Sequence, residues 1–120
     1  MPYFYVSYAI IEILKENKSY LEFKDAVITT TVLNLFEVYY YLLRVYNQKT
    51  ADFLVRNFNF NFLELTPRVS IEASRFRFAN KSKDLSLTDC VGYILSLNNN
   101  LKFLTGDSKF ENVENVEFVK

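Results

Sequence analysis

Short apolar runs alternate along the chain with longer segments in which apolar residues recur every three or four positions. The short runs are typical of strands buried on both faces of a sheet, and the spaced pattern is typical of helices. The predicted strands are 3–6, 26–29, 60–65, 101–105 and 116–119. The predicted helices are 8–16, 20–24, 31–46, 49–57, 67–80 and 86–97. This alternation predicts an α/β fold with three layers, α/β/α, around a central parallel sheet of about five strands.

Several predicted helices carry a start signal, and two strand ends carry positions of interest. Ser7 is expected to cap the first helix, and Thr66-Pro67 is a typical helix start. Ser86-Leu-Thr-Asp89 has the form of a capping box. In a parallel α/β sheet, ligands bind beyond the carboxyl ends of the strands. Position 6 is the last residue of the first predicted strand and Asp107 follows the end of another, so we expect function to gather around them.

The composition predicts one folded domain over residues 1–120, because half of the residues are apolar and 18% are aromatic. Lys and Arg together number 14, as do Asp and Glu, so the chain has no overall basic field. Any binding of nucleic acid would therefore need a local basic patch. The cations considered for such a patch, each of which could equally lie on a solvated helix face, are Arg44, Arg56, Arg75, Arg77, Lys81 and Lys83.

Two rare residue types exclude several chemistries. The absence of His excludes a Ser-His-Asp triad and a His-ligated zinc site, and the single Cys excludes an internal disulfide. Cys90 is predicted to be a small packing residue rather than a nucleophile. No run approaches the ~18 consecutive apolar residues of a membrane span, and the start lacks the basic region of a signal peptide. We therefore expect a cytoplasmic protein with no membrane partner.

Three acidic residues lie at unusual places in the apolar pattern. Asp89 opens an apolar helix, Asp107 directly follows an apolar strand, and Glu37 shares a helical stripe with apolar neighbours. Each has a plain structural explanation, as a helix-dipole acid, a turn residue or a solvated side chain respectively. Carboxylates beside buried segments are nevertheless costly without a partner, and a hard divalent cation is their usual partner. Together the three acids indicate a site for Mg²⁺ or Mn²⁺.

The chain resembles the PIN domain family over nearly its whole length, and in particular the small VapC-like toxins of toxin–antitoxin pairs. The resemblance is strongest at Leu85-Ser-Leu-Thr-Asp89 and at Phe103-Leu-Thr-Gly-Asp107-Ser-Lys-Phe110. Glu37 matches the glutamate that this family carries in the helix after its second strand. The spacing agrees as well, since Asp89 lies 52 residues after Glu37 and 18 residues before Asp107.

The resemblance implies an endoribonuclease that hydrolyses RNA phosphodiesters with Mg²⁺ or Mn²⁺ and needs no other cofactor. It implies that Asp89 and Asp107 are metal ligands and that Glu37 completes the acidic pocket or orients a water. It also implies a catalytic role for Ser7, which would bind a water or a phosphate oxygen. The implied partners are RNA, a cognate antitoxin protein and a second copy of the chain in a homodimer.

The chain departs from the family at the end of its first strand, where the family has an Asp-Ser or Asp-Thr pair. Ser7 fills the hydroxyl position, but Val6 stands where the aspartate belongs. The nearest acid, Glu12, lies more than a helical turn further on. A valine offers no metal ligand and suits an apolar site, so we expect a chain that folds, binds metal weakly and cleaves RNA slowly or not at all.

Two alternatives remain open from the sequence. One is a catalytically inactive PIN-like binding or regulatory protein, in which the aromatic residues of 39–41 and 58–62 form an interaction surface rather than part of the core. The other is a response-regulator-like α/β domain with an acidic pocket. That domain would need a phosphorylatable Asp after a central strand and a Lys beyond a later one, a pattern that we do not find.

Overall fold

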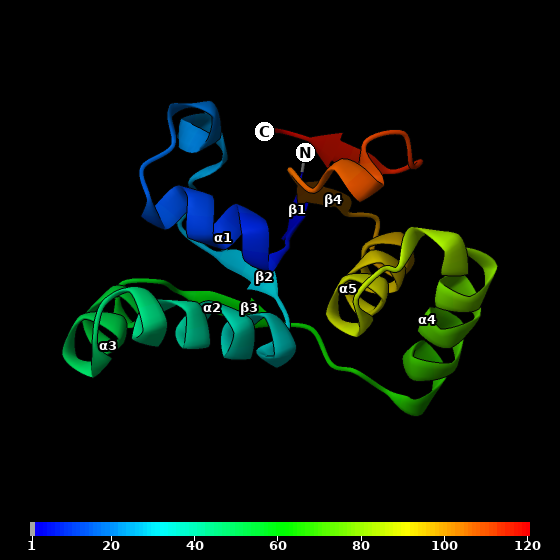
Figure 1. Ribbon diagram of the computed structural model, residues 1–120, viewed down its shortest axis with the longest axis horizontal. Coiled ribbons are helices and arrows are strands. Elements are labelled where there is room, and N and C mark those ends of the chain that lie inside the picture. Colours follow the sequence, from blue (N-terminus) through cyan, green and yellow to red (C-terminus); the bar gives the residue numbers. More distant parts are fainter. Residues whose placement is uncertain (1) are drawn as a thin grey trace.

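The computed structural model describes residues 2–120, in which strands and helices alternate as the sequence predicts (Figure 1). The strands are β1 (Tyr3–Tyr5), β2 (Ile28–Thr30), β3 (Phe60–Phe62), β4 (Lys102–Thr105) and β5 (Val116–Phe118). The α-helices are α1 (Ser7–Leu14), α2 (Val32–Val45), α3 (Gln48–Arg56), α4 (Pro67–Ala79) and α5 (Leu87–Asn98). Short 3-10 helices occupy η1 (Lys18–Phe23), η2 (Lys81–Lys83) and η3 (Ser108–Phe110).

All strand pairs are parallel, which confirms the predicted α/β class, but the strands form two small sheets rather than one of five. One sheet has the order β1-β4-β5, and the other pairs β2 with β3. Strand β2 lies beside β1 without a backbone ladder between them. The hydroxyl of Thr30 donates to the carbonyl of Tyr5 at 2.7 Å, so a side chain takes an acceptor that a continuous sheet would give to a backbone amide.

The helices cover the strands in two groups. Helices α1, α2 and α3 lie on one flank of the strands, and α4 packs against α5 on the other (Figure 1). Within residues 2–120, no helix is both long and apolar enough to cross a membrane. The arrangement leaves the carboxyl ends of β1 and β4 between the two groups of helices.

The core is built from aromatic rings of β1, β4 and the segment after β4. The rings of Phe4 and Phe103 stack with centroids 6.1 Å apart, and Phe110 lies 4.8 Å from Phe103. Helix α5 approaches this cluster closely at Gly92, where an added Cβ would come within 2.6 Å of the Phe4 ring. Cys90 is buried in the same helix, and burial raises the pKa of its thiol, as expected for a packing residue.

The predicted helix starts are correct at Thr66 and Ser86 and wrong at Ser7, and Thr31 caps a further helix. Thr31, Thr66 and Ser86 each cap a helix by accepting a hydrogen bond from a backbone amide three residues later. The first helix instead begins at Ser7 itself, after Val6, which makes no side-chain cap. The predicted cap role of Ser7 is therefore wrong, because the Ser7 hydroxyl donates to a side chain of another helix.

Most aromatic residues of the 39–41 and 58–62 segments lie outside the buried core. Tyr40 is 57% exposed and Phe62 is 41% exposed. The other four, which are partly buried, are Tyr39, Tyr41, Phe58 and Phe60. Three of the partly buried rings, those of Tyr39, Phe58 and Phe60, pack against the core, so these segments place aromatic rings both at the edge of the core and on the surface.

Candidate active site

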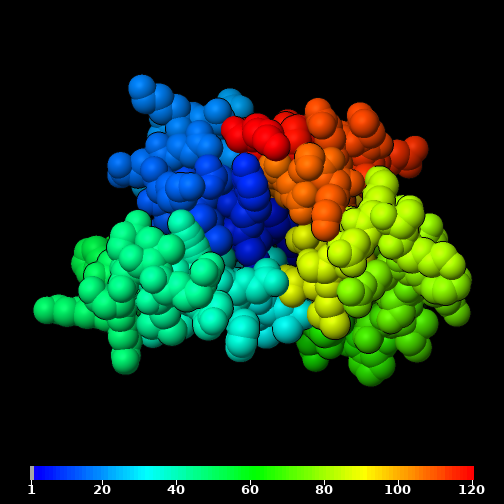
Figure 2. Space-filling view, in the orientation of Figure 1, coloured from blue at the N-terminus to red at the C-terminus, as the bar shows by residue number. Residues whose placement is uncertain are grey.

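The acidic residues singled out from the sequence line one hollow of about 360 Å³, at the carboxyl ends of β1 and β4. Figure 2 shows the blue amino-terminal segment, yellow α5 and the orange segment after β4 meeting near the centre of one face. The side chains and backbone that line the hollow come from Ser7, Tyr8, Glu37, Ser86, Asp89, Thr105, Gly106, Asp107, Ser108 and Lys120. All four of the predicted site residues are among them.

Asp89 lies in the first turn of α5, where Ser86 accepts a hydrogen bond from its backbone amide at 3.1 Å. Its pKa is raised from 3.8 to about 6, first by burial and further by the negative charges of Glu37 and Asp107. A hydrogen bond with Ser86 and the charge of Lys109 act in the opposite direction. The three carboxylates therefore share one electrostatic environment, in which a proton or a cation is favoured near neutral pH.

Asp107 is held in place by a close approach of the chain at Gly106. A Cβ on Gly106 would collide with the ring of Tyr8 and with the carbonyl oxygen of Val119, so only glycine fits. The Thr105 hydroxyl accepts a hydrogen bond from the Asp107 amide at 3.1 Å. Asp107 Oδ1 in turn accepts one from the Lys109 amide at 3.0 Å, which caps η3. Strand β4 thus delivers a half-buried carboxylate to the hollow in a defined orientation.

Glu37 lies on the exposed side of α2 and reaches the hollow through Ser7. The Ser7 hydroxyl donates to Glu37 Oε1 at 2.5 Å. Asn34 Nδ2 donates to Ser7 Oγ at 3.0 Å, and Asn34 Oδ1 accepts from the Thr31 hydroxyl at 2.6 Å. These bonds join α1 to α2 at the edge of the hollow, and they hold Glu37 on the side occupied by Ser7.

Val6 directly follows β1 and contributes no side-chain ligand to the hollow. It is 1% exposed and belongs to the apolar core. Its backbone amide donates to the carbonyl of Leu104 at 3.4 Å, and its carbonyl accepts from the amide of Ile10 at 3.1 Å. The residue therefore serves as a well-packed connection between β1 and α1, whose side chain offers no lone pair to a cation.

The donor atoms around the hollow fit a hard cation that keeps most of its water. They are carboxylate and hydroxyl oxygens, which suit Mg²⁺ or Mn²⁺ rather than a softer metal. Across residues 2–120, however, no three Asp, Glu, His or Cys side chains converge tightly enough to hold an ion between them. Mg²⁺ sites often use only one or two carboxylates with water, and Asp89 with Asp107 is the pair that suits such a site.

The cations expected at a rim mostly have local partners. Arg77 Nε donates to the carbonyl of Leu85 at 3.0 Å, the Lys81 ammonium lies 4.7 Å from the centroid of the Phe78 ring, and the Arg44 guanidinium lies 5.6 Å from that of Tyr40. Arg77 therefore supports the loop before α5. The structure provides no such contact for Arg56 or Arg75 among the residues that it describes.

Sequence reasoning missed three residues near the hollow. Lys109 lowers the pKa of Asp89, and its ammonium donates to the carbonyl of Asp84 at 2.9 Å. Its place two residues after Asp107 was an available signal. Asn34 lies one helical turn before Glu37, a spacing that puts both on one face of α2. Lys120 lines the hollow from the end of the chain, and no local pattern pointed to it.

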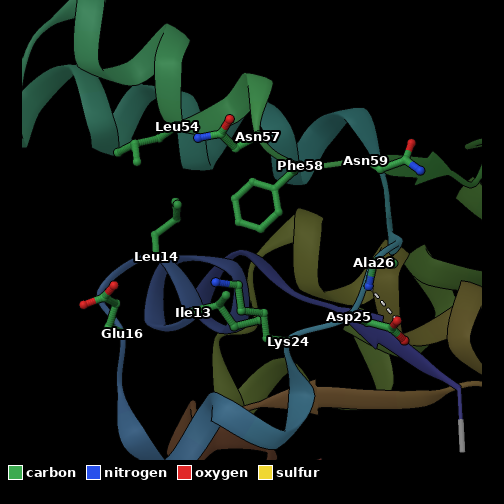
Figure 3. Close-up of a pocket in the computed structure, with 10 residues that line it drawn as sticks. All are labelled: Ile13, Leu14, Glu16, Lys24, Asp25, Ala26, Leu54, Asn57, Phe58 and Asn59. Carbon is green, nitrogen blue, oxygen red and sulfur yellow. Dashed lines mark hydrogen bonds between the residues drawn. The ribbon is translucent and has the colours of Figure 1, made fainter.

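A second hollow, of about 310 Å³, lies at the other end of the strands, between α1 and α3 (Figure 3). The side chains of Leu14 and Phe58 point into it, and Asn59 and Ala26 border it just before β3 and β2. Asp25 lies at its edge, where its carboxylate accepts from the amide of Ala26 at 2.6 Å. Glu16 and Lys24 also line it, and Figure 3 shows Glu16 and Asp25 on opposite sides, so this hollow has two separated acids where the first has three.

The fold and the acidic hollow define an α/β domain whose carboxylates gather where parallel strands end. The sequence profile of the PIN domain matches residues 6–116, which is most of the chain. The chain therefore belongs to the PIN domain family, and a nuclease is the broad class of activity that this membership supports. No curated protein matches the chain in a sequence search.

Solved structures share the fold over nearly the whole chain. "Crystal structure of VapBC2 from Rickettsia felis bound to a DNA fragment from their promoter" contains a chain with a TM-score of 0.75 and 18% identity, and all of both chains is covered. A toxin–antitoxin complex from Klebsiella pneumoniae gives 0.72 and 13% identity, covering 96% of this chain and 95% of that chain. PAE2754 from Pyrobaculum aerophilum gives 0.66 and 13%, covering 98% and 86%. At these identities the likeness establishes the fold alone.

Proposed function

We propose that the protein is a metal-dependent endoribonuclease, the toxin of a toxin–antitoxin pair, whose activity is weakened by Val6. The observation that carries the proposal is the hollow lined by Glu37, Asp89 and Asp107, in which burial, and then the charges of the two other acids, raise the pKa of Asp89. Three carboxylates in one electrostatic environment need a counter-charge, and Mg²⁺ or Mn²⁺ would supply it. Membership of the PIN domain family supports nuclease chemistry as the use of that charge.

Each side chain has a distinct task in the proposed hydrolysis. Asp89 and Asp107 would hold the ion, directly or through water. When bound, a divalent cation neutralises the phosphate and makes an attacking water more acidic. Glu37 Oε1 accepts from Ser7, so Oε2 is the oxygen that would bind the ion or orient a water beside it. Lys109, whose charge already acts on Asp89, would contact a phosphate of the RNA backbone.

Val6 weakens this machinery by removing one negative charge from beside the ion. Cation affinity depends on the number and charge of the oxygen ligands. A side chain that is 1% exposed and apolar stabilises the fold but leaves two carboxylates and one held glutamate to attract the cation. We therefore expect weak binding of Mn²⁺ and slow cleavage of RNA, with the fold retained.

The antitoxin would bind an apolar groove on α2 and α3. The groove has a volume of about 410 Å³ and is lined by Val32, Leu35, Phe36, Tyr39, Tyr40, Leu43 and Val55. Phe36 is 74% exposed, which is costly for a large apolar side chain unless a partner covers it. An amphipathic helix lays its apolar face into a groove of this kind. Two of the similar structures are toxin–antitoxin complexes, which supports this partner.

The test compares the natural chain with Val6→Asp and with Val6→Asn, a control of similar size that adds no charge. Mn²⁺ affinity and cleavage of single-stranded RNA are measured for each folded variant. We expect Val6→Asp to bind Mn²⁺ at least about tenfold more tightly and to cleave faster, and Val6→Asn to do neither. Equal affinity and equal cleavage in all three chains would contradict the proposal.

A second candidate function is an inactive PIN-like binding or regulatory protein. It is favoured by the environment of Glu37, which already has a hydrogen-bond donor in Ser7, and by the apolar residue at position 6. This candidate predicts no cleavage by the natural chain at any Mn²⁺ concentration, with binding of a helical partner at the α2–α3 groove retained. Metal-dependent cleavage that disappears in Asp89→Asn would exclude it.

A further inference from the structure

Two fully buried polar side chains stand behind the exposed Glu37. Thr31 and Asn34 are each 1% exposed, although neither is an apolar residue. A buried amide or hydroxyl costs free energy unless each of its donors and acceptors finds a partner. Asn34 satisfies this requirement by bridging Thr31 and Ser7, which brings its two ends into contact with two different segments of the chain.

The supply of protons fixes the direction of this chain of hydrogen bonds. The Thr31 hydroxyl accepts from the backbone amide of Asn34 at 3.2 Å and donates its own proton to Asn34 Oδ1. Asn34 Nδ2 then faces Ser7 and donates to its oxygen. Since Ser7 receives a proton from Asn34, its own hydroxyl proton is available for Glu37.

The opposite orientation of the Asn34 amide would break the chain at its last bond. With Oδ1 facing Ser7, the Ser7 proton would point to Asn34. The Ser7 oxygen and Glu37 Oε1, 2.5 Å apart, would then meet as two acceptors without a proton between them. That contact is repulsive for an ionised carboxylate, so the observed distances require the first orientation.

We propose that Asn34 is a positioning residue, which directs the hydroxyl proton of Ser7 towards Glu37 and so holds the Glu37 carboxylate beside the acidic hollow. An apolar residue at position 34 would leave the Ser7 hydroxyl free to rotate. It would also release the side chain of Glu37, which lies on the exposed side of α2. The effect of Asn34 on the hydrogen bond between Ser7 and Glu37 is inferred from the geometry alone. Its value for cation binding rests on the proposed function.

The first experiment uses NMR on the metal-free chain and compares Asn34→Leu with Asn61→Leu. Asn61 is a matched control, because its side-chain amide also donates to a hydroxyl, that of Thr29 at 3.4 Å, away from the hollow. We expect a nuclear Overhauser effect between the Ser7 and Glu37 side chains in the natural chain and in Asn61→Leu, and its loss in Asn34→Leu. Its persistence in a folded Asn34→Leu chain would overturn the proposal.

Substitutions of Thr31 provide a second route that does not depend on the folding of Asn34→Leu. Thr31→Ser keeps the hydroxyl that fixes the amide of Asn34, and Thr31→Val removes it at nearly constant volume. The side-chain amide protons of Asn34 are expected to be protected from exchange in the natural chain and in Thr31→Ser, and to lose protection in Thr31→Val and Ser7→Ala. Unchanged protection in both of the latter variants would contradict the bridge.

The second experiment measures Mn²⁺ affinity in the Val6→Asp background by a double-mutant cycle. Partners that orient a metal ligand typically change affinity by 10- to 100-fold, so Asn34→Leu is expected to weaken binding about tenfold. If Asn34 acts through Ser7, the same substitution changes affinity less than about twofold once Ser7→Ala is present. Additive effects would overturn the positioning role. Absence of Mn²⁺ binding in every chain would instead refute the proposed function, and the NMR comparison would still decide the role of Asn34.

Discussion

The two hollows at opposite ends of the strands are similar in size, about 360 and 310 Å³, but differ in chemistry. At the carboxyl ends, Glu37, Asp89 and Asp107 come from three separate segments, and burial, with the charges of Glu37 and Asp107, raises the pKa of Asp89. At the amino ends, Leu14 and Phe58 fill the space between α1 and α3 (Figure 3). Volume alone would not distinguish the two hollows, whereas a gathering of like charges does.

The difference follows from the direction of the chain in a parallel fold. Every strand of this protein delivers its carboxyl end to the same edge, so residues that follow β1 and β4 meet there without being close in sequence. The opposite edge receives the segments that precede β2 and β3, where Lys24 and Asp25 lie beside apolar residues of α1 and α3. We infer that three acids are tolerated around one hollow because a ligand compensates their charge, and the predictions below test this contrast.

The largest expected effect is on stability, at the strand end that carries Asp107. Gly106→Ala places a Cβ against the ring of Tyr8 and the carbonyl of Val119. We expect a loss of about 3 kcal/mol in the free energy of unfolding, because a backbone carbonyl cannot move aside as a flexible side chain can. Ala26→Val, at the edge of the other hollow, should change stability by less than about 0.5 kcal/mol. Urea denaturation measures both, and equal losses would contradict the account.

A smaller effect is expected from truncating Phe58, which lines the second hollow, between α1 and α3. Phe58 is partly buried and its ring lies 5.6 Å from that of Phe60. Phe58→Ala should cost about 2 kcal/mol of stability, less than a fully buried Phe would. The same substitution should leave Mn²⁺ affinity in the Val6→Asp background unchanged. A loss of Mn²⁺ affinity in a folded Phe58→Ala chain would mean that the two hollows are not independent.

The pH dependence of the metal-free chain reports the third effect. Because folding raises the pKa of Asp89 from 3.8 to about 6, the folded state binds the proton more tightly than the unfolded state. The contribution of Asp89 is therefore most favourable below about pH 4 and is lost as the pH rises through about 6. We expect Asp89→Asn to remove this fall and to raise stability at pH 7 by about 1–2 kcal/mol, after allowance for solvent screening.

The control for this prediction is Asp25→Asn at the edge of the second hollow. It should retain the fall in stability between pH 4 and 6, since Asp89 remains. Thermal unfolding without divalent ions, followed at several pH values, measures all three chains. If the stability of the natural chain instead rises between pH 4 and 6, and Asp89→Asn removes that rise, the direction of the Asp89 pKa shift is wrong.

The smallest expected effect concerns the cation beside the acids. Lys109→Ala should weaken binding of a single-stranded RNA and reduce the slope of log affinity against log salt by about 0.7, the value for one phosphate contact. Lys24→Ala, at the second hollow, serves as a control of equal charge and should leave the slope unchanged. Fluorescence anisotropy at several salt concentrations makes the comparison. Equal slopes in both variants would remove Lys109 from the RNA interface.

The sequence predicted those features that depend on local pattern. Thr66 and Ser86 are caps because a β-region residue with a side-chain oxygen precedes a helix. The location of Asp89 and Asp107 around one hollow follows from the ends of α5 and β4 in a parallel fold. Their assignment as metal ligands, with Glu37, is still a prediction.

The features that sequence reasoning missed depend on partners far along the chain. Ser7 looked like a cap, but Glu37, thirty residues away, accepts its proton instead. The expected single sheet is divided because Thr30 reaches the carbonyl of Tyr5, a contact between segments 25 residues apart. Asn34 shares a helix face with Glu37, but its role in bridging Thr31 and Ser7 is visible only in the fold. Local pattern cannot reveal such choices of partner.

The most direct measurement uses Mn²⁺ as a paramagnetic probe of the natural, isotope-labelled chain, since its line broadening detects even a weakly held ion. The account predicts that substoichiometric Mn²⁺ broadens the amide signals of Asp89 and Asp107 first, while those of Leu54 and Phe58 stay sharp. Mg²⁺ in excess should restore the broadened signals. Broadening that is uniform over the surface, or that begins at the second hollow, would contradict a cation site at the carboxyl ends of the strands.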